Sequence, residues 1–302
     1  MNAESTTQLP QTQRDRLKHL EFRLRFLGEV RRADLMARFG IRSAAASRDL
    51  ALYKELAPFN AEFDQRSKLY ALGQGFAPLF ETQPDQALSW LVDQVGDVVA
   101  PTGDSLLPCA MPARLTTPKV DVLATVTRAI HLHQALRIKY HSISSGQSER
   151  EIVPFALLDT GLRWQVRAYD RKSAEFRDFV LARIHEPRLC SDNPPQRQEL
   201  PEHDVQWTRI VDLQLVPHPD RLHPEVTCMD YGISGGSLNL SVRGAMAGYV
   251  LRRWSVDCSP DHGLTGPEHR LWLRDHLALY GVRSAVIAPG YQSSPLGANA
   301  DG

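Results

Sequence analysis

Arginine, hydroxyl and aromatic side chains recur between residues 140 and 183, and this combination can bind an anion. The residues concerned are Tyr140, Ser142, Ser145, Gln165, Arg167, Tyr169, Arg177, Phe179 and Arg183. Guanidinium and hydroxyl groups hold anionic oxygens by charge-assisted hydrogen bonds, and aromatic rings add cation–π contacts. The set therefore predicts a site for an unknown anionic or nucleic-acid-like effector. The alternative is that the arginines pair with acidic residues of neighbouring strands and only hold a sheet together.

A second cluster, near the N-terminus, has the composition of a DNA-reading helix. It begins Ser43-Ala44-Ala45-Ala46-Ser47-Arg48, and alanines are small enough to let the backbone approach base edges, which Ser47 and Arg48 can then reach. The candidate DNA-binding residues are Arg42 in the turn before this helix, Ser43, Ala44, Ser47, Arg48 and Lys54 on it, and Arg66, Ser67 and Lys68 on a hairpin. Residues 12–72 carry 13 Lys/Arg against 8 Asp/Glu in a chain of zero net charge, as expected of a DNA-contacting module.

Three helices and a hairpin must position these residues. Apolar periodicity predicts helices over 14–27, 32–39 and 43–57. Gly28 can cap the first helix, and Pro58 stops the third. Strands over 60–64 and 68–72 would form a wing whose turn presents Arg66 and Lys68 to the sugar-phosphate backbone. The pattern is that of a winged helix-turn-helix, with a generic three-helix bundle as the alternative.

Four short runs of alternating residues must position the anion-binding set. They span 136–142, 149–157, 163–170 and 176–184. In the third run Trp164 and Arg167 point to opposite faces, because side chains of a strand alternate with period two. Runs this short, joined by tight loops, favour a small, strongly bent sheet or barrel.

The remaining segments predict a connector, a linker and a third domain. A helix over 86–99 and a Pro-rich loop over 101–118 form the connector, and a helix over 118–134 leads into the first strand. A polar linker is expected over 185–204. Beyond it, strands over 210–216 and 237–242 and a helix over 245–254 indicate an α+β domain, with 269–279 either helix or strand.

The strand-rich region resembles the WYL-domain proteins. The resemblance lies in Ile138-Lys139-Tyr140, Arg150 to Pro154, Trp164 to Tyr169 and Phe176 to Ile184. Gln165 and Val166 replace the Tyr and Leu of the naming triplet. This variant, together with Ala57-Pro58-Phe59-Asn60 and Lys68-Leu69-Tyr70 near the N-terminus, is similar to the BrxR/CapW-like transcriptional repressors of bacterial phage-defence loci.

The resemblance implies an α+β multidomain protein. Its expected parts are a winged helix-turn-helix over 12–80, a connector over 81–118, a WYL-like ligand-sensing domain with a small Sm/SH3-like β-barrel over 119–190, and an α+β dimerisation domain over 205–290. It further implies a homodimer that binds an inverted-repeat operator in double-stranded DNA and controls an anti-phage defence operon.

Other functions find little support in the sequence. Gly232 to Gly236 lacks the Lys-Ser/Thr of a phosphate loop, and neither Gly-x-Ser-x-Gly nor His-Glu-x-x-His occurs, so neither an enzyme nor a cofactor is expected. The four isolated cysteines have no zinc spacing, and His131 and His133 diverge on a helix, so no metal is expected. No stretch approaches the ~20 apolar residues of a membrane span, and a cytoplasmic location is expected.

A competing hypothesis comes from a different class of protein. The barrel of an accessory protein could bind single-stranded DNA or RNA without sequence preference. A palindrome-specific footprint on duplex DNA would separate the repressor from such a protein.

Overall fold

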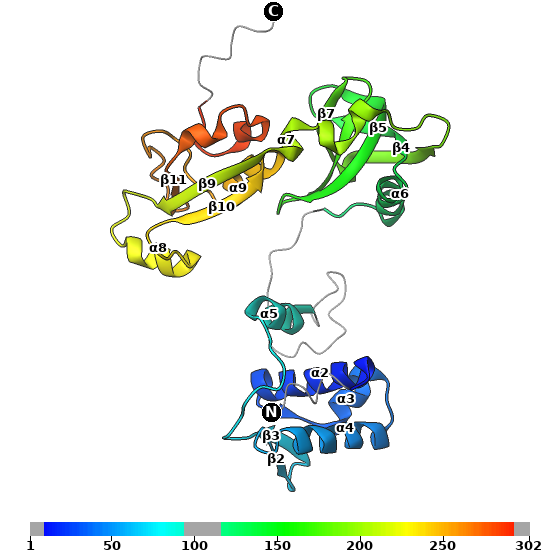
Figure 1. Ribbon diagram of the computed structural model, residues 1–302, viewed down its shortest axis with the longest axis vertical. Helices are drawn as coiled ribbons and strands as arrows, with labels where there is room; N and C mark the ends of the chain where they lie inside the picture. Colours follow the sequence, from blue (N-terminus) through cyan, green and yellow to red (C-terminus); the bar gives the residue numbers. More distant parts are fainter. Residues whose placement is uncertain (1–8, 94–115, 293–302) are drawn as a thin grey trace, which may run out of the picture. The chain divides into compact units, whose positions relative to one another are not determined.

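The N-terminal unit contains the three expected helices and the wing. A computed structural model describes residues 9–93 and 116–292, and the chain divides into two units between Ala113 and Arg114 (Figure 1). The elements are α2 (Gln11–Leu27), β1 (Glu29–Val30), α3 (Arg32–Phe39), α4 (Ser43–Leu56), β2 (Ala61–Asp64), β3 (Leu69–Leu72) and α5 (Pro84–Asp93). The strands pair in the order β1-β3-β2. The rest of the predicted 86–99 helix and nearly all of the Pro-rich loop lie outside the described residues.

Glycines and one buried carboxylate fix this unit. Gly28 and Gly40 adopt left-handed backbone angles and end α2 and α3. The core gathers the leucines of α2 with Leu50 and Tyr53 of α4. The buried Glu21 side chain accepts hydrogen bonds from the backbone N–H groups of residues 79 and 80, at 2.8 and 2.9 Å, and from the Tyr53 hydroxyl at 2.9 Å. Glu21 therefore ties the segment after the wing to the first helix.

The second unit begins with a helix packed on a five-stranded antiparallel sheet. Its elements are α6 (Val120–His131), β4 (Ala135–Ser142), β5 (Gly146–Asp159), β6 (Trp164–Asp170), β7 (Glu175–Val180) and β8 (Ile184–Cys190). The strand order is β7-β6-β5-β4-β8. α6 buries Val122, Val126 and Ala129 in the core that it shares with the sheet.

Two expectations about this sheet were wrong. The fourth run does not continue to residue 184, because Leu181–Arg183 forms the 3-10 turn η1. The predicted linker then begins too early, since Ile184–Cys190 is a fifth strand that pairs with β4. Pro187 lies in this strand, and β8 is an edge strand, where a missing N–H is tolerated.

The predicted barrel closure is not confirmed. In the hydrogen-bonded order of the described strands, β7 and β8 lie at the two edges. At the end of β7 the Val180 backbone N–H donates to the Tyr140 hydroxyl of β4 at 3.2 Å. A side-chain contact therefore joins β7 and β4 across the curved sheet.

The C-terminal part of this unit is an α+β layer. After the turns η2 (Arg197–Glu199) and η3 (Pro201–His203) come α7 (Val205–Thr208), β9 (Ile210–Pro217), α8 (Pro224–Tyr231), β10 (Leu238–Arg243), α9 (Gly244–Arg253), β11 (Leu271–Leu273), η4 (His276–Leu279) and η5 (Arg283–Ile287). The sheet order is β10-β9-β11. The ambiguous segment 269–279 contains both a strand and a helical turn, and α8 was not predicted.

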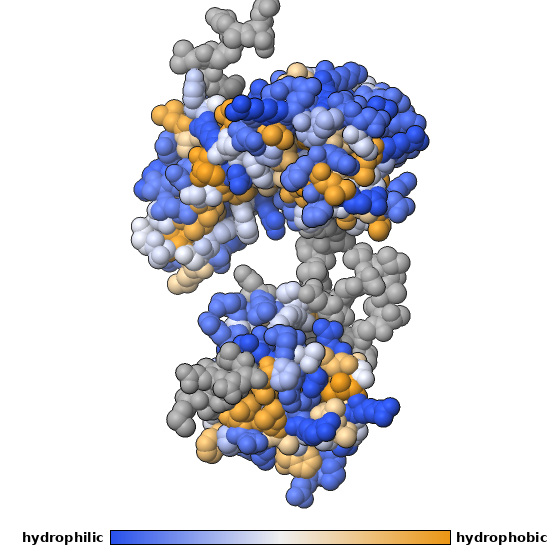
Figure 2. Space-filling model, turned by 45° about the vertical axis from the view of Figure 1, so that its right-hand side comes forward, coloured by the Kyte–Doolittle hydropathy of each residue, from blue (hydrophilic) through white to orange (hydrophobic). Residues whose placement is uncertain are grey.

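α9 packs unusually close to η5. A Cβ built on Gly248 would lie 1.7 Å from the Ser284 carbonyl oxygen, so only glycine fits there. None of the described helices is long and apolar enough to cross a membrane. Figure 2 shows hydrophobic patches between hydrophilic atoms on the face of each unit that is in view.

Candidate nucleic-acid interface and sensor site

The N-terminal half of α4 presents small and basic side chains outward. Ala46, Leu50 and Tyr53 are buried, whereas Ala44 and Arg48 are exposed on the other side of the helix. This places a guanidinium beside a surface of small side chains, as close approach to base edges requires.

Ser47 has a neighbour that the sequence did not reveal. Its hydroxyl accepts a hydrogen bond at 3.3 Å from Nη1 of Arg32, an exposed residue at the start of α3. Ser47 is only partly exposed, whereas Arg32 and Arg48 are both exposed. This surface therefore carries two guanidinium groups. The two partners are 15 residues apart and meet only because α3 and α4 pack together, so no local pattern identifies Arg32.

The wing turn holds its cations on a fixed backbone. The Asp64 carboxylate accepts hydrogen bonds from the Arg66 backbone N–H at 2.8 Å and from the Ser67 hydroxyl. The bond from Ser67 lowers the pKa of Asp64. Lys68 adopts a left-handed φ of 55°. Arg66, Ser67 and Lys68 are all exposed, and the Ser67 hydroxyl is already engaged within the turn.

The remaining predicted DNA contacts are also accessible. Arg42, Ser43 and Lys54 are exposed, the first at the N-cap position of α4. All nine candidates therefore lie on α4 or on the wing of one unit, and their role stays a prediction.

The predicted effector residues are not gathered on one surface. Tyr140 and Phe179 are buried, and their ring centroids lie 5.0 Å apart in an edge-to-face pair of the sheet core. Ser142 lies at the end of β4 and Ser145 in the turn before β5, whereas Arg183 lies on η1. The alternation argument placed Phe179 and Arg183 on one strand face, but the chain leaves the strand at residue 181.

Arg167 is the centre of a buried ion cluster. Its Nε and Nη2 donate to both Asp204 oxygens at 2.6 and 3.0 Å, and its Nη1 donates to Asp178 at 2.8 Å. The other Asp178 oxygen accepts from the Tyr249 hydroxyl of α9 at 3.1 Å, and the same hydroxyl lies 3.4 Å from Gln165 Oε1. The cluster therefore joins the β6–β7 hairpin to the linker and to α9.

One guanidinium faces two carboxylates in this cluster. Burial raises the pKa of Asp178 above its ordinary value, although the charge and hydrogen bond of Arg167 oppose the shift. Burial alone would lower the pKa of Arg167, but its bonds to Asp204 and the charge of Asp178 raise it. The cluster therefore contains one cation and two carboxylates, which leaves one negative charge in excess when both carboxylates are ionised. Arg167 is 5% exposed, so its partners leave little of it for a ligand.

Two cavities lie beside this cluster, between the β6–β7 hairpin and the C-terminal layer. Their volumes are about 380 and 360 Å³, and both are lined by Arg167, Glu175 and Arg283. Arg177 lines the larger one. Glu175 contacts Arg177 at 2.9 Å and Arg283 at 3.8 Å, so two cations share one carboxylate. Their side chains are 50% and 67% exposed, which leaves positive charge accessible at the rim.

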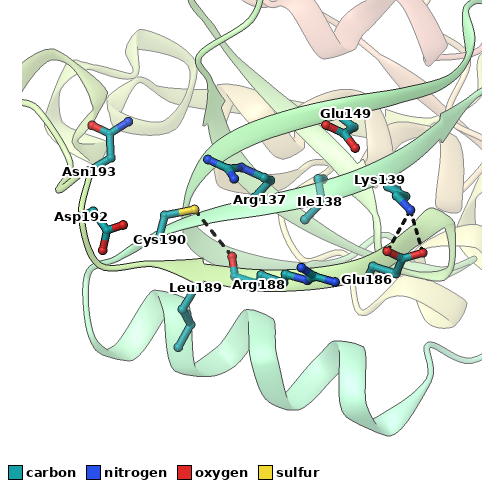
Figure 3. A pocket seen from close by; sticks show the side chains of 10 residues that line it. All are labelled: Arg137, Ile138, Lys139, Glu149, Glu186, Arg188, Leu189, Cys190, Asp192 and Asn193. Carbon is teal, nitrogen blue, oxygen red and sulfur yellow. Dashed lines mark hydrogen bonds and ion pairs between the residues drawn. The ribbon is translucent and has the colours of Figure 1, made fainter.

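A third cavity, of about 440 Å³, lies over β4 and β8 (Figure 3). None of the nine predicted effector residues lines it. Lys139 is paired with Glu186 at 2.8 Å, and Arg137 with Glu151 at 3.4 Å. Arg137, however, shares Glu151 with Arg171, and Arg188 of the same lining has no acidic partner within the described residues, so charge alone does not separate this cavity from the one beside Arg177. The cavity beside Arg177 differs in being lined by two of the predicted effector residues, Arg167 and Arg177.

The last predicted effector residue, Tyr169, packs on its neighbour. Its ring lies edge-on to Phe176, with centroids 5.1 Å apart. Within the described ranges, no group of three or more His, Cys, Asp or Glu side chains is placed to hold a metal ion.

Comparison with known families covers all three parts of the chain. Residues 12–93 match the BrxR transcriptional regulator winged helix-turn-helix domain, and residues 121–189 match the WYL domain. Residues 210–279 match the BrxR transcriptional regulator C-terminal dimerization domain. The order of the matches is the order predicted from the sequence.

Similar proteins carry a common description. The DNA-binding transcriptional repressor CapW of Escherichia coli is 30% identical over 260 residues, which are 83% of this chain and 85% of that protein. The CapW repressor of Pseudomonas aeruginosa is 30% identical over 267 residues, 85% of this chain and 86% of that one. The solved structure of proteasome accessory factor B/C from Arthrobacter aurescens is 19% identical, covers 90% of this chain and 45% of that one, and gives a TM-score of 0.28, too low to compare folds. The chain belongs to the BrxR/CapW family of WYL-domain, winged helix-turn-helix transcriptional repressors.

Proposed function

We propose that this repressor binds an inverted-repeat operator as a homodimer and controls a bacterial anti-phage defence operon. The observation that carries the proposal is the exposed basic surface of α4, where Arg48 and the Arg32–Ser47 pair lie in one unit with the wing cations. A helix entering the major groove reads bases with such side chains, while cations on a wing contact phosphates.

We expect dimerisation because the DNA-binding surface of one protomer is small. One helix-turn-helix covers one half-site, so a palindromic operator is matched by two protomers related by the same two-fold axis. We assign this role to residues 205–290, which include the segment matched by the dimerization-domain model. The sequence-derived limits of the other parts, 12–80, 81–118 and 119–190, belong to the same proposal.

We further assign effector binding to the cavity beside Arg177. Arg177 and Arg283 share a single carboxylate there, so an anionic or nucleic-acid-like effector gains charge-assisted hydrogen bonds. The same cavity is lined by Asp178 and Tyr249, which connect it to α9. An effector changes DNA affinity only by its difference in affinity for the two states of the repressor.

A footprint on the promoter of its own operon tests DNA recognition. The full-length protein is expected to protect two half-sites about one helical turn apart, or a multiple of it. Scrambling either half-site should abolish the footprint at a fixed salt concentration. Equal affinity for the scrambled duplex, or tighter binding to single strands, would favour the accessory-protein alternative.

A reporter driven by the operator tests the effector site. Arg177→Ala is expected to repress normally but to respond weakly to phage or nucleic-acid stress, because half of its side chain faces solvent at the cavity rim. Arg137→Ala, in the cavity over β4 and β8, is the matched control and should respond like the wild type. A normal response of the Arg177 variant with a lost response of the Arg137 variant would move the site to the other cavity.

A further inference from the structure

α8 turns apolar side chains away from its own domain. Val226 and Met229, one turn apart, are 49% and 79% exposed, and Leu222, just before the helix, is 92% exposed. Thr227 is the buried residue of the helix. A surface helix of a globular protein normally buries its apolar stripe, whereas in α8 these apolar side chains are exposed together with Glu225 and Asp230.

The inner side of α8 already has a partner. Tyr231 packs against the core formed by β9, β10 and α9, and Asp230 pairs with Arg270 at 2.6 Å. None of the three outward residues belongs to that core or packs against it. The outward stripe of α8, defined as Leu222, Val226 and Met229, is therefore an exposed apolar surface whose burial by a partner is favourable.

We propose that a second copy of this chain covers the outward stripe of α8, so that two α8 helices meet at the two-fold axis of the dimer. The inference rests on the proposed dimeric function and names the surface that performs it. All three residues lie within 210–279, the segment matched by the dimerization-domain model. In a two-fold interface the same patch meets itself, and an apolar stripe is complementary to its own copy.

Charges at the two ends of α8 fit an antiparallel arrangement. Glu225 lies in the first turn, and the exposed Asp230–Arg270 pair lies at the last. Antiparallel packing about a two-fold axis brings the Glu225 end of one helix to the Asp230–Arg270 end of the other, where the exposed Arg270 can share its charge between Asp230 and the incoming Glu225. The helix has only 8 residues, whereas a stable interface buries ~800 Å² per partner, so the stripe is the centre of a larger patch.

Sedimentation of the full chain over a range of concentrations tests the proposal. Val226→Glu and Met229→Glu each place a charge in the proposed contact and are expected to weaken the dimer ~30-fold or more, the effect of a hot-spot residue. Both side chains are exposed, so circular dichroism and thermal unfolding of the monomer should not change. Ile143→Glu is the matched control, because Ile143 is 85% exposed but lies in the turn between β4 and β5, outside residues 205–290.

A charge exchange tests the orientation. Glu225→Arg alone should weaken the dimer, and adding Arg270→Glu together with Asp230→Arg, which inverts the pair at the other end of the helix, should restore it. A wild-type chain that stays monomeric at all concentrations refutes the dimeric function itself. A dimer that survives both stripe variants, or that is lost in the Ile143 control, leaves that function standing and overturns the assignment to α8. A failure of the exchange to restore association, with the stripe variants monomeric, overturns the antiparallel arrangement.

Discussion

Removing single members of the Arg167 cluster should produce a distinctive order of stabilities. Asp204→Ala removes both bonds to Nε and Nη2 and leaves a buried guanidinium short of a partner, which costs about 3–5 kcal/mol. It also removes the side-chain cap of α7, worth about 1 kcal/mol more. Tyr249→Phe removes one hydrogen bond to a carboxylate at 3.1 Å, and we expect about 1.5 kcal/mol.

Asp178→Asn should cost least of the three, under about 1 kcal/mol, because it removes the surplus negative charge while Asp204 still pairs with Arg167. The folded-state pKa of Asp178 lies above its ordinary value of 3.8. The stability contributed by its protonated form is therefore complete below the unfolded pKa and is lost as pH rises through the folded pKa. The asparagine does not lose this contribution, so the cost of Asp178→Asn relative to the wild type should shrink from acidic to neutral pH.

Urea unfolding and hydrogen exchange measure these effects. A loss of 1.5 kcal/mol corresponds to about tenfold more frequent opening, which exchange of the α7 and α9 amides would report for Tyr249→Phe. Asp178→Leu, which cannot hydrogen-bond, is the control that separates charge from bonding. If Asp178→Asn destabilises the protein as much as Asp204→Ala, the view of one cation facing two carboxylates is refuted.

Three further variants test other parts of the chain. Arg48→Ala should weaken operator binding by about 1–3 kcal/mol in a gel-shift titration and leave thermal unfolding unchanged; equal affinity would remove Arg48 from base recognition. Lys68→Asn removes the cation while tolerating the left-handed φ of 55°, so it should weaken specific and non-specific binding alike and flatten the log–log salt slope by about one unit; a loss confined to one base pair would contradict a phosphate contact. Gly248→Ala should lower the melting temperature, because its Cβ would meet the Ser284 carbonyl; an unchanged value would show that η5 yields freely.

Local signals predicted the helices of the N-terminal unit well. Gly28 and Gly40 end α2 and α3, and Pro58 follows α4 closely, so chain chemistry alone marks these boundaries. The stripe through Ala46, Leu50 and Tyr53 is likewise a local pattern, and it is buried. The strands before Val180 followed their alternation in the same way.

Contacts between distant residues explain the errors. The alternation of side chains continues past Val180, although the chain turns at Leu181. The sequence of β8 is polar, and its strand character comes from pairing with β4, which lies about 50 residues earlier and leaves no local signal. Arg167 could not be assigned because Asp204 lies 37 residues away in a segment that resembled a linker. α8 was missed because its 8 residues are fewer than the window over which a helical period stands out, although Leu222, Val226 and Met229 recur at helical spacing.

The pairing of β8 with β4 constrains how the chain folds during its synthesis. Every residue of the buried cluster that joins α2 to α4 lies before residue 81, so that cluster can close while the rest is still on the ribosome. β4 must wait for Ile184–Cys190 before its second edge is covered. Arg167 then has Asp178 as its only acidic partner from the cluster until Asp204 emerges, so a chain stalled with β8 outside the ribosome and Asp204 still inside lacks the two hydrogen bonds that Asp204 accepts from this guanidinium. Chaperone binding to stalled chains should therefore peak between the completion of β8 and the arrival of Asp204.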